Sequence, residues 1–386
     1  MTADAKVNRR GAERWTKGHP WIFASDVIRE PGTPGVVTVA DERGKALGRA
    51  LYSPQSEIRL RLLESAPNRM VDRAWWRDRI AACLARRAGI DATAYRVVHG
   101  EGDGLPSLVV DRYDRWVVAQ LLSAGLEAVR DDVAGAIADV LEPAGILLRH
   151  DVGVRRREGL PADVTLAVGT VPEEIEVREG PIRFLVEPWT GQKTGAFLDQ
   201  RDNRRRAAAH LPAGGTALDC FSYHGSFALH LAAGAAEVVA LDVSAEALAR
   251  GARNAALNGF TNLTWTEADA FDALREFGRS RRRFDLVVVD PPAFAKNKAS
   301  LPRAIKGYKD INLHAMRLVQ AGGHLVTASC SYHLRWPDFL AMLADAAQDS
   351  GRRVTMVEHL AQPIDHPEIL TIPETGYLKA AVLRID

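Results

Sequence analysis

Short apolar runs alternate with stretches of helical periodicity from about residue 187 to the C-terminus. Runs as continuously apolar as these are typical of strands buried on both faces, which requires a parallel sheet covered by helices on both sides. The pattern predicts a doubly wound, Rossmann-like α/β domain. The expected strands read TALDCF, EVVALDV, LTWTEAD, FDLVVVD, GGHLVTASC and YLKAAVLRI, with helices near 226–233, 245–257, 308–318 and 336–350.

Two further domains are expected in front of this one, because 386 residues are too many for one compact domain. Up to about residue 68, short strand-like runs separated by turn residues predict a small β-barrel. Residues 69–186 contain a helical pattern that places Cys83 on a core face, and residues 107–123 have the pattern of a strand hairpin. This middle part is expected to be an α+β domain, and 187–386 form the third domain.

Composition narrows the class of protein. No run of about 18 apolar residues is present, and the polar N-terminus lacks the apolar core of a secretory signal. Three widely separated cysteines suit neither a zinc site nor a disulfide framework, so we expect a cytoplasmic protein without a metal. The net charge of +1 hides basic clusters that are either solvated or contact phosphates. These clusters lie at 6–17, 155–157, 201–206, 281–283 and 296–309.

Acidic residues close three successive strands of the predicted sheet, Asp219, Asp242 and Asp269. Asp242 is placed to bind a ribose diol, and Asp269 is placed to meet an adenine edge. The turn after Asp219 has one glycine, Gly225, instead of the GxGxxG that binds a pyrophosphate. An acidic turn suits a cationic ligand without phosphate, such as S-adenosylmethionine. The alternative is that Asp219 and Asp242 only cap helices.

Residues 191–194 read GQKT, like the end of a P-loop, but Val186 stands where that motif requires glycine. We therefore expect no nucleoside triphosphate there and interpret this stretch as a loop leading into a helix beside the cofactor. The charged residues that follow could form no more than surface pairs: Asp199, Arg201, Asp202 and Arg204.

A carboxylate and a thiol are expected side by side at the edge of the sheet. One apolar strand ends in Asp290-Pro291-Pro292, and a second ends in Ser329-Cys330-Ser331. The two prolines remove backbone donors and stiffen the turn, which then can hold a planar base. The carboxylate of Asp290 and the thiol of Cys330 together suggest covalent chemistry on a pyrimidine ring.

The chemistry would begin with attack of the Cys330 thiolate on carbon 6 of cytosine, which makes carbon 5 able to accept a methyl group. Asp290 would hydrogen-bond the base near N3. Lys296 and His333 are candidates for ionising the thiol. The alternative for Cys330 is a buried core thiol. A DPP motif also occurs in enzymes that methylate nitrogens, in which Phe294 would stack on a purine.

Together these motifs resemble the RlmI-type ribosomal RNA large-subunit cytosine-5 methyltransferases. The resemblance covers essentially the whole chain and rests on CFSYHGSFALH, VVALDVSAEAL, VVDPPAFAKNKASL, GYKDINLHAM and SCS, with GHPWIFASDV, KTGAFLDQRDNR and IDHPEILTIPETGYLKA. It implies an N-terminal PUA domain that binds RNA, S-adenosylmethionine as methyl donor, and a cytosine of ribosomal RNA, 23S RNA in particular, as target. A homodimer is possible, and a non-enzymatic RNA-binding factor is the alternative of another class.

The resemblance assigns Cys330 as nucleophile and Asp290 as the acid that contacts the base. No second cysteine follows the DPP prolines, so a single-cysteine mechanism is implied. His224 and Ser226 stand where relatives often have Thr and Gly, and Ala293 where they have Lys. The residues expected to line the cofactor are Thr194, Gly195, Phe197, Asp199, Arg201, Asp219, Phe221, Ser222, Tyr223, Gly225, Phe227, Asp242, Val243, Ser244, Asp269, Ala270, Phe271, Asp290 and Pro291.

Overall fold

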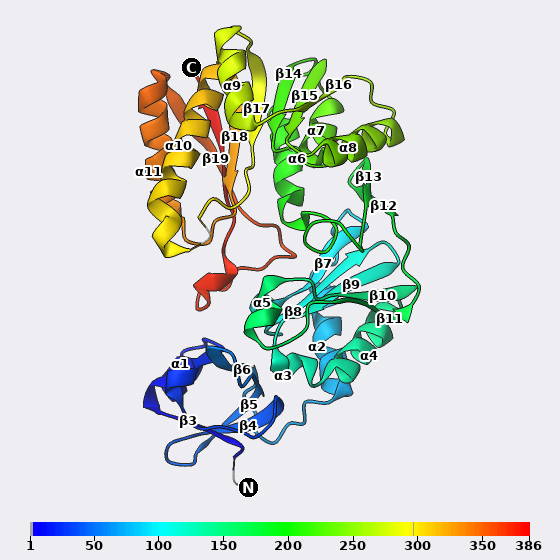
Figure 1. Ribbon diagram of the computed structural model, residues 1–386, viewed down its shortest axis with the longest axis vertical. Helices are drawn as coiled ribbons and strands as arrows, with labels where there is room; N and C mark the ends of the chain where they lie inside the picture. The colour runs from blue at the N-terminus through cyan, green and yellow to red at the C-terminus, as the bar shows by residue number, and fades with distance from the viewer. Residues whose placement is uncertain (1–2, 296) are drawn as a thin grey trace. The chain divides into compact units, whose positions relative to one another are not determined.

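The computed structural model describes residues 3–295 and 297–386. These residues form two compact units (Figure 1), of which the first runs to Val177 and also contains Val186–Leu198 and Ile364–Thr375. The second unit consists of Arg178–Leu185, Asp199–Pro363 and Gly376–Asp386. The expected domain limits at residues 68 and 186 stay a prediction.

Short strands build the first sheet of the first unit, in the order β2-β6-β5-β4-β1-β3. Strands β4, β5 and β6 form an antiparallel meander. Alternate residues of β4, Val37 and Val39, pack into a core that also holds Trp15 of α1. The small β domain expected at the N-terminus is confirmed. Its elements are β1 (Ala5–Val7), α1 (Arg9–Thr16), β2 (Trp21–Phe23), β3 (Val27–Arg29), β4 (Gly35–Asp41), β5 (Ala46–Tyr52) and β6 (Ile58–Glu64).

The second sheet of the first unit has five strands in the order β11-β10-β9-β8-β7. The expected hairpin at 107–123 is confirmed, since β8 and β9 pair antiparallel. Helix α2 is capped by Asp72, whose carboxylate accepts from the Trp75 amide, and it buries Cys83 in the core as expected. The elements are α2 (Arg73–Arg86), β7 (Ala94–His99), β8 (Leu108–Tyr113), β9 (Trp116–Leu121), α3 (Ala124–Glu127), α4 (Arg130–Leu141), β10 (Gly145–Arg149), α5 (Gly153–Arg157) and β11 (Val164–Gly169).

The sheet of the second unit has seven strands in the order β16-β15-β14-β17-β18-β20-β19. The first five strands are parallel, and β20 and β19 extend the sheet antiparallel. The strand order reverses between β14 and β17, where an open α/β sheet leaves a crevice for ligands. The strands are β14 (Thr216–Cys220), β15 (Glu237–Asp242), β16 (Leu263–Glu267), β17 (Phe284–Val289), β18 (Val319–Ser329), β19 (Val354–Leu360) and β20 (Lys379–Ile385).

Helices cover both faces of this sheet, with α6–α8 on one side and α9–α11 on the other (Figure 1). Tyr308 and Phe339 belong to one apolar core, and Phe227 belongs to the other. The doubly wound α/β fold predicted for this part of the chain is therefore confirmed. The helices are α6 (Arg201–Ala209), α7 (Ser226–Ala232), α8 (Ala245–Leu257), α9 (Ala270–Arg279), α10 (Leu301–Leu318) and α11 (Trp336–Ser350).

Two elements differ from the expectation. Helix α10 begins at Leu301, about two turns before the expected start at residue 308, and Pro302 occupies its first turn, where proline fits because no backbone donor is needed. Strand β19 was not among the predicted strands. Its residues alternate between half-buried and exposed, which is the pattern of a sheet edge rather than of a doubly buried strand.

Arg204 corrects the expectation of surface pairs in α6. It is 2% exposed, and its guanidinium donates to both carboxylate oxygens of Glu179, at 2.9 and 2.6 Å. Glu179 ends β12 (Ile175–Glu179), which forms a hairpin with β13 (Ile182–Val186). The pair therefore fixes α6 to this hairpin. Among the residues that the structure describes, no helix is both long and apolar enough to cross a membrane.

Candidate active site

The carboxyl ends of β14, β17 and β18 lie at the same edge of the second unit's sheet. Cys220 pairs with Val289, and Val289 pairs with Thr327, and both pairings are parallel. The turn after β14, the Asp290 turn and Cys330 consequently meet at one edge, beside the point where the strand order reverses. This edge carries the strand-end acids and the thiol that the sequence singled out.

The turn after β14 is shaped by Asp219. One carboxylate oxygen accepts from the Ser222 hydroxyl at 2.7 Å and from the Ala228 amide, in the first turn of α7, at 3.0 Å. Gly225 has φ +87°, and a Cβ there would lie 2.5 Å from the ring of Trp265. Only glycine meets both conditions, because the left-handed backbone and the ring each exclude a side chain. The backbone can thus approach a ligand closely here.

Asp219 is almost completely buried, 1% exposed. Burial is the main reason that the pKa of its carboxyl group is raised to about 7. The bonds from Ser222 and Ala228 act against this shift, and the charges of Asp290 and Asp242 add to it. A bound cation would favour the ionised form. The sulfonium and amino groups of S-adenosylmethionine fit such an environment.

Asp242 and Asp269 bind backbone amides at the ends of their strands. Asp242 accepts from the amides of Tyr223 and Ser244, at 2.8 and 2.9 Å, and so ties the β14 turn to the end of β15. Asp269 caps α9 by accepting from the Phe271 amide at 2.8 Å. These carboxylates therefore organise the turns, and each retains lone pairs for a ligand hydroxyl or amine. Their contact with the cofactor stays a prediction.

His224 lies in the same turn but faces the core. It is 1% exposed, and its ring stacks on Phe184 with centroids 5.5 Å apart. Burial, helped by the charges of Arg204 and Arg250, lowers the pKa of His224 to about 3, so the ring stays neutral. Among the described residues neither ring nitrogen has a hydrogen-bond partner. The histidine at this place in the turn thus serves packing.

The loop residues expected near the cofactor are divided between the two units. Thr194 lies in the first unit with Gly195 and Phe197; its hydroxyl donates to Asp111 at 2.6 Å and is 2.9 Å from the Tyr113 hydroxyl. Asp199 and Arg201 belong to the second unit, where Asp199 accepts from the Tyr377 hydroxyl at 2.8 Å. The cofactor roles of these five residues remain predictions.

Cys330 directly follows β18 and is half-buried, whereas Cys83 and Cys220 are buried. Burial raises the pKa of Cys83 to about 11 and that of Cys220 well above its usual range. A nucleophile must be accessible and able to ionise, which these two thiols are not. Of the three cysteines, Cys330 is therefore the one suited to reaction.

Two buried serines hold Cys330 between them. Both Ser329 and Ser331 are 0% exposed, and the Ser331 amide donates to the Ser329 hydroxyl at 3.2 Å. The Ser331 hydroxyl accepts from the Ala295 amide at 3.1 Å and is 2.9 Å from the Tyr308 hydroxyl. These bonds connect the cysteine turn to the DPP loop and to α10. The backbone that carries the Cys330 thiol is consequently held in place by hydrogen bonds on both sides.

A pocket of about 690 Å³ opens between the DPP loop and the first turns of α10. Phe271 and Phe294 line it with ring centroids 6.1 Å apart, and exposed Arg303 adds a positive charge. The remaining lining residues are Pro292, Ala293, Asn297, Ser300, Ala304 and Gly307. Aromatic rings beside a cation suit an unstacked base and its phosphate.

Lys296 and His333 are the two candidates for ionising the Cys330 thiol. Lys296 lies outside the described residues. His333 is half-buried in the turn after Cys330, with its ring edge-on to Tyr332 at 5.3 Å between centroids. Its role toward the thiol stays a prediction.

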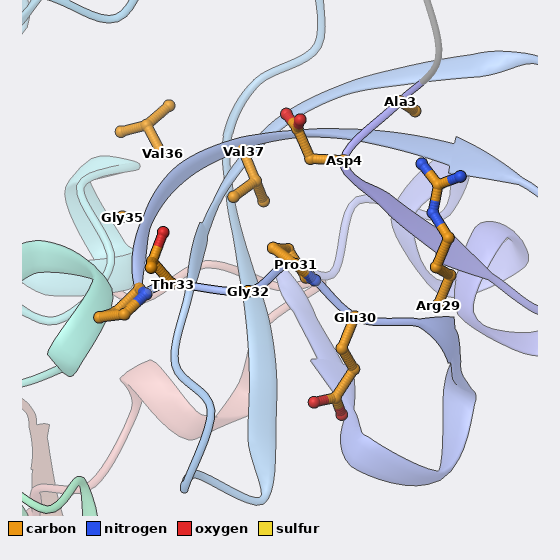
Figure 2. Close-up of a pocket in the computed structure, with 11 residues that line it drawn as sticks. Ala3, Asp4, Arg29, Glu30, Pro31, Gly32, Thr33, Gly35, Val36 and Val37 are labelled. Atoms are coloured by element: carbon orange, nitrogen blue, oxygen red, sulfur yellow. The ribbon is translucent and has the colours of Figure 1, made fainter.

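A second hollow, of about 480 Å³, lies along the loop that joins β3 to β4 of the N-terminal sheet. Figure 2 shows Asp4 and Arg29 on one side of it and Glu30 turned away from both. The Asp4 carboxylate already binds the amide and hydroxyl of Thr38, at 2.8 and 2.7 Å. Its charges are mixed, and it has neither the strand-end acids nor the thiol, so the candidate active site is the sheet edge of the second unit.

The chain is similar to known methyltransferases. Residues 138–384 match a family of S-adenosylmethionine-dependent methyltransferases, and residues 5–65 match a PUA-like domain. Proteins named Ribosomal RNA large subunit methyltransferase I are 40% identical in Alteromonas mediterranea and Shewanella amazonensis and 39% in Klebsiella pneumoniae. Each match covers 95% of this chain and 94–95% of the relative.

Solved structures show the same fold. A SAM-dependent methyltransferase from Streptococcus mutans superposes with a TM-score of 0.82 at 20% identity, over 98% of this chain and 99% of the other. The methyltransferase SMU.776, solved in complex with SAH, gives 0.83 at 21% identity over the same shares. This chain belongs to the S-adenosylmethionine-dependent methyltransferase family, in the group of the ribosomal RNA large subunit methyltransferases I, with a PUA-like domain at its N-terminus and S-adenosylmethionine as its cofactor.

Proposed function

We propose that this enzyme methylates carbon 5 of a cytosine in large-subunit ribosomal RNA through a covalent bond to Cys330. The names of its relatives support ribosomal RNA as the substrate. The observation that carries the cytosine chemistry is the position of Cys330. It is a half-buried thiol on a hydrogen-bonded turn, at the same sheet edge as Asp290.

In the proposed mechanism, bound S-adenosylmethionine supplies an electrophilic methyl group. The Cys330 thiolate forms a bond to carbon 6, and the electron pair of the 5,6 double bond moves to carbon 5, which takes the methyl group. Asp290 hydrogen-bonds the base near N3 and stabilises the charge that builds on the ring. A base then removes the carbon 5 proton, the double bond re-forms, and the thiolate leaves.

The pocket beside the DPP loop supports binding of an unstacked nucleotide. A target base in a duplex must leave the stack, which costs a few kcal/mol that the protein has to offset. The rings of Phe271 and Phe294 offer stacking surface, and Arg303 offers a phosphate contact. We assign this pocket to the RNA strand next to the target cytosine.

Arg303→Glu is expected to weaken RNA binding several-fold, because it reverses the charge at a phosphate contact. The slope of log affinity against log salt should become shallower by at least about one. Filter binding across a salt series measures both quantities. The control is Arg283→Glu, since exposed Arg283 precedes β17 at the opposite edge of the sheet. Equal effects of the two variants would argue against the assignment.

Nucleoside analysis tests the proposal directly. Undermethylated ribosomal RNA is incubated with the protein and methyl-labelled S-adenosylmethionine, digested, and examined by mass spectrometry. We expect 5-methylcytidine, and bisulfite sequencing should place it at one position. Label on a purine nitrogen would favour the alternative in which Phe294 stacks on a purine. Absence of cofactor binding by calorimetry would favour a non-enzymatic RNA-binding factor.

A further inference from the structure

Lys379 is a buried lysine beside the candidate nucleophile. It begins β20, where it pairs across the antiparallel ladder with Ser329, the residue before Cys330. The side chain is 4% exposed. Lysine is rarely buried so completely, because an ammonium group loses its hydration there. Its position therefore calls for an explanation beyond strand packing.

The ammonium group of Lys379 binds the backbone of the cysteine turn. It donates to the carbonyl of Ser331 at 2.7 Å and to the carbonyl of Tyr377 at 2.6 Å. Ser331 directly follows Cys330, and its own side chain is held by Ala295 and Tyr308. The buried ammonium group of Lys379 thus holds the backbone that directly follows Cys330.

Several other titratable groups surround Cys330. On α10, burial raises the pKa of Tyr308, and the charge of Cys330 raises it further, so the phenol stays neutral. Asp290 follows the neighbouring strand β17 and contributes a negative charge, and His333 follows in the turn. Lys379 supplies positive charge from β20. In a poorly solvated site an opposite charge nearby favours the ionised form of an acid.

We propose that Lys379 is the positioning residue that holds the Cys330 turn and stabilises the Cys330 thiolate. The inference rests on the proposed function in taking Cys330 as the nucleophile. The lysine acts through the carbonyl of Ser331 and through its charge. Thiolate formation then needs no histidine partner, and the proton goes to solvent before the substrate binds. A cation fixed beside a cysteine is one of the features that favour the thiolate form.

Alkylation of Cys330 by iodoacetamide tests the proposal without substrate or cofactor, because only the thiolate reacts. The full-length protein is labelled between pH 5.5 and 10, and the Cys330 peptide is quantified by mass spectrometry. In Lys379→Met and Lys379→Gln the midpoint of the pH profile should rise by at least about one unit, which slows labelling at pH 7 about tenfold. The plateau at high pH should be unchanged.

A comparison of Lys379→Gln with Lys379→Arg separates charge from hydrogen bonding. Gln retains a donor for the carbonyls but has no charge. Arg retains the charge and should keep the midpoint close to that of the wild type. Lys309→Met is the control, since Lys309 is partly exposed and pairs with Asp349 at 2.8 Å. Thermal melting identifies the variants that fold. If Lys379→Met does not fold, Lys379→Gln is the decisive variant.

An unchanged midpoint in folded Lys379→Gln would overturn the proposal and leave Lys379 as a strand-packing residue. A shifted midpoint together with methylation of a purine nitrogen would retain the role of Lys379 toward the thiol and reject the cytosine chemistry. An unshifted midpoint in Lys379→Gln, together with 5-methylcytidine as product, would retain the cytosine chemistry and reject the role of Lys379 toward the thiol. The failure of either idea is therefore visible separately.

Discussion

Cys330→Ala is expected to lose methyl transfer by several orders of magnitude and to bind S-adenosylmethionine as the wild type does. Carbon 5 of cytosine is a poor nucleophile until a bond forms at carbon 6, so removal of the thiol removes the route and not merely one contact. Asp219, Asp242 and Gly225 are untouched by the substitution, and Ser329 and Ser331 still hold the turn. Transfer of labelled methyl groups to ribosomal RNA and calorimetry with the cofactor measure the two quantities.

A covalent trap makes this expectation sharper. RNA carrying 5-fluorocytidine at the target lacks the proton that must leave, so the wild type should remain bonded to it after methyl transfer. The adduct should survive denaturing gel electrophoresis, and Cys330→Ala should form none. Cys83→Ala is the control, because Cys83 is buried in the first unit. Full activity in Cys330→Ala, or an adduct that survives the substitution, would reject the mechanism.

The strand ends of the second unit could be predicted from sequence because they follow from local pattern. A doubly buried strand is continuously apolar, and the residue that ends the run marks the carboxyl edge of the sheet. This pattern locates Asp219, Asp242, Asp290 and Cys330. What each carboxylate binds could not be predicted, since the amides that Asp219 and Asp242 bind come from turns whose shape depends on the assembled sheet.

Buried charges show where local reasoning stops. Charged residues normally lie in solvent, and nothing in the local pattern marks Lys379 or Arg204 as buried. Lys379 is buried because two carbonyls meet its ammonium, and one of them lies 48 residues away in the chain. Arg204 is buried because Glu179 comes from a strand of another motif. Neither partner lies within a helical turn or along the same strand, so no periodicity could reveal it.

Arg204→Met is expected to lower the free energy of unfolding by about 3–5 kcal/mol, the usual cost of leaving one partner of a buried ion pair without the other. Glu179 is 4% exposed and the Arg204 side chain 2%, so water cannot replace the lost guanidinium. Burial raises the pKa of Glu179, but Arg204 and, less strongly, His230 and Arg201 lower it by more, so the net shift is downward. Urea unfolding followed by tryptophan fluorescence measures the loss.

The sign of the pH dependence distinguishes this explanation from a packing defect. A carboxyl group whose folded pKa is depressed contributes stability above its unfolded pKa and loses it as pH falls through the folded value. In Arg204→Met the strongest of the charges that lower the pKa of Glu179 is gone and burial remains, so Glu179 should bind a proton more readily than in the wild type. The difference between wild type and variant should therefore be largest near neutral pH and shrink toward pH 5.

Two matched variants complete the test. Arg205→Met changes the exposed neighbour in the same helix and should alter stability by less than about 0.5 kcal/mol. Arg204→Met combined with Glu179→Leu removes both charges, and it should recover much of the loss because no buried carboxylate remains. If the double variant were no more stable than Arg204→Met, or if the loss were independent of pH, the helix would depend on the bulk of Arg204 rather than on its charge. The β12–β13 hairpin would then be held to α6 by packing alone.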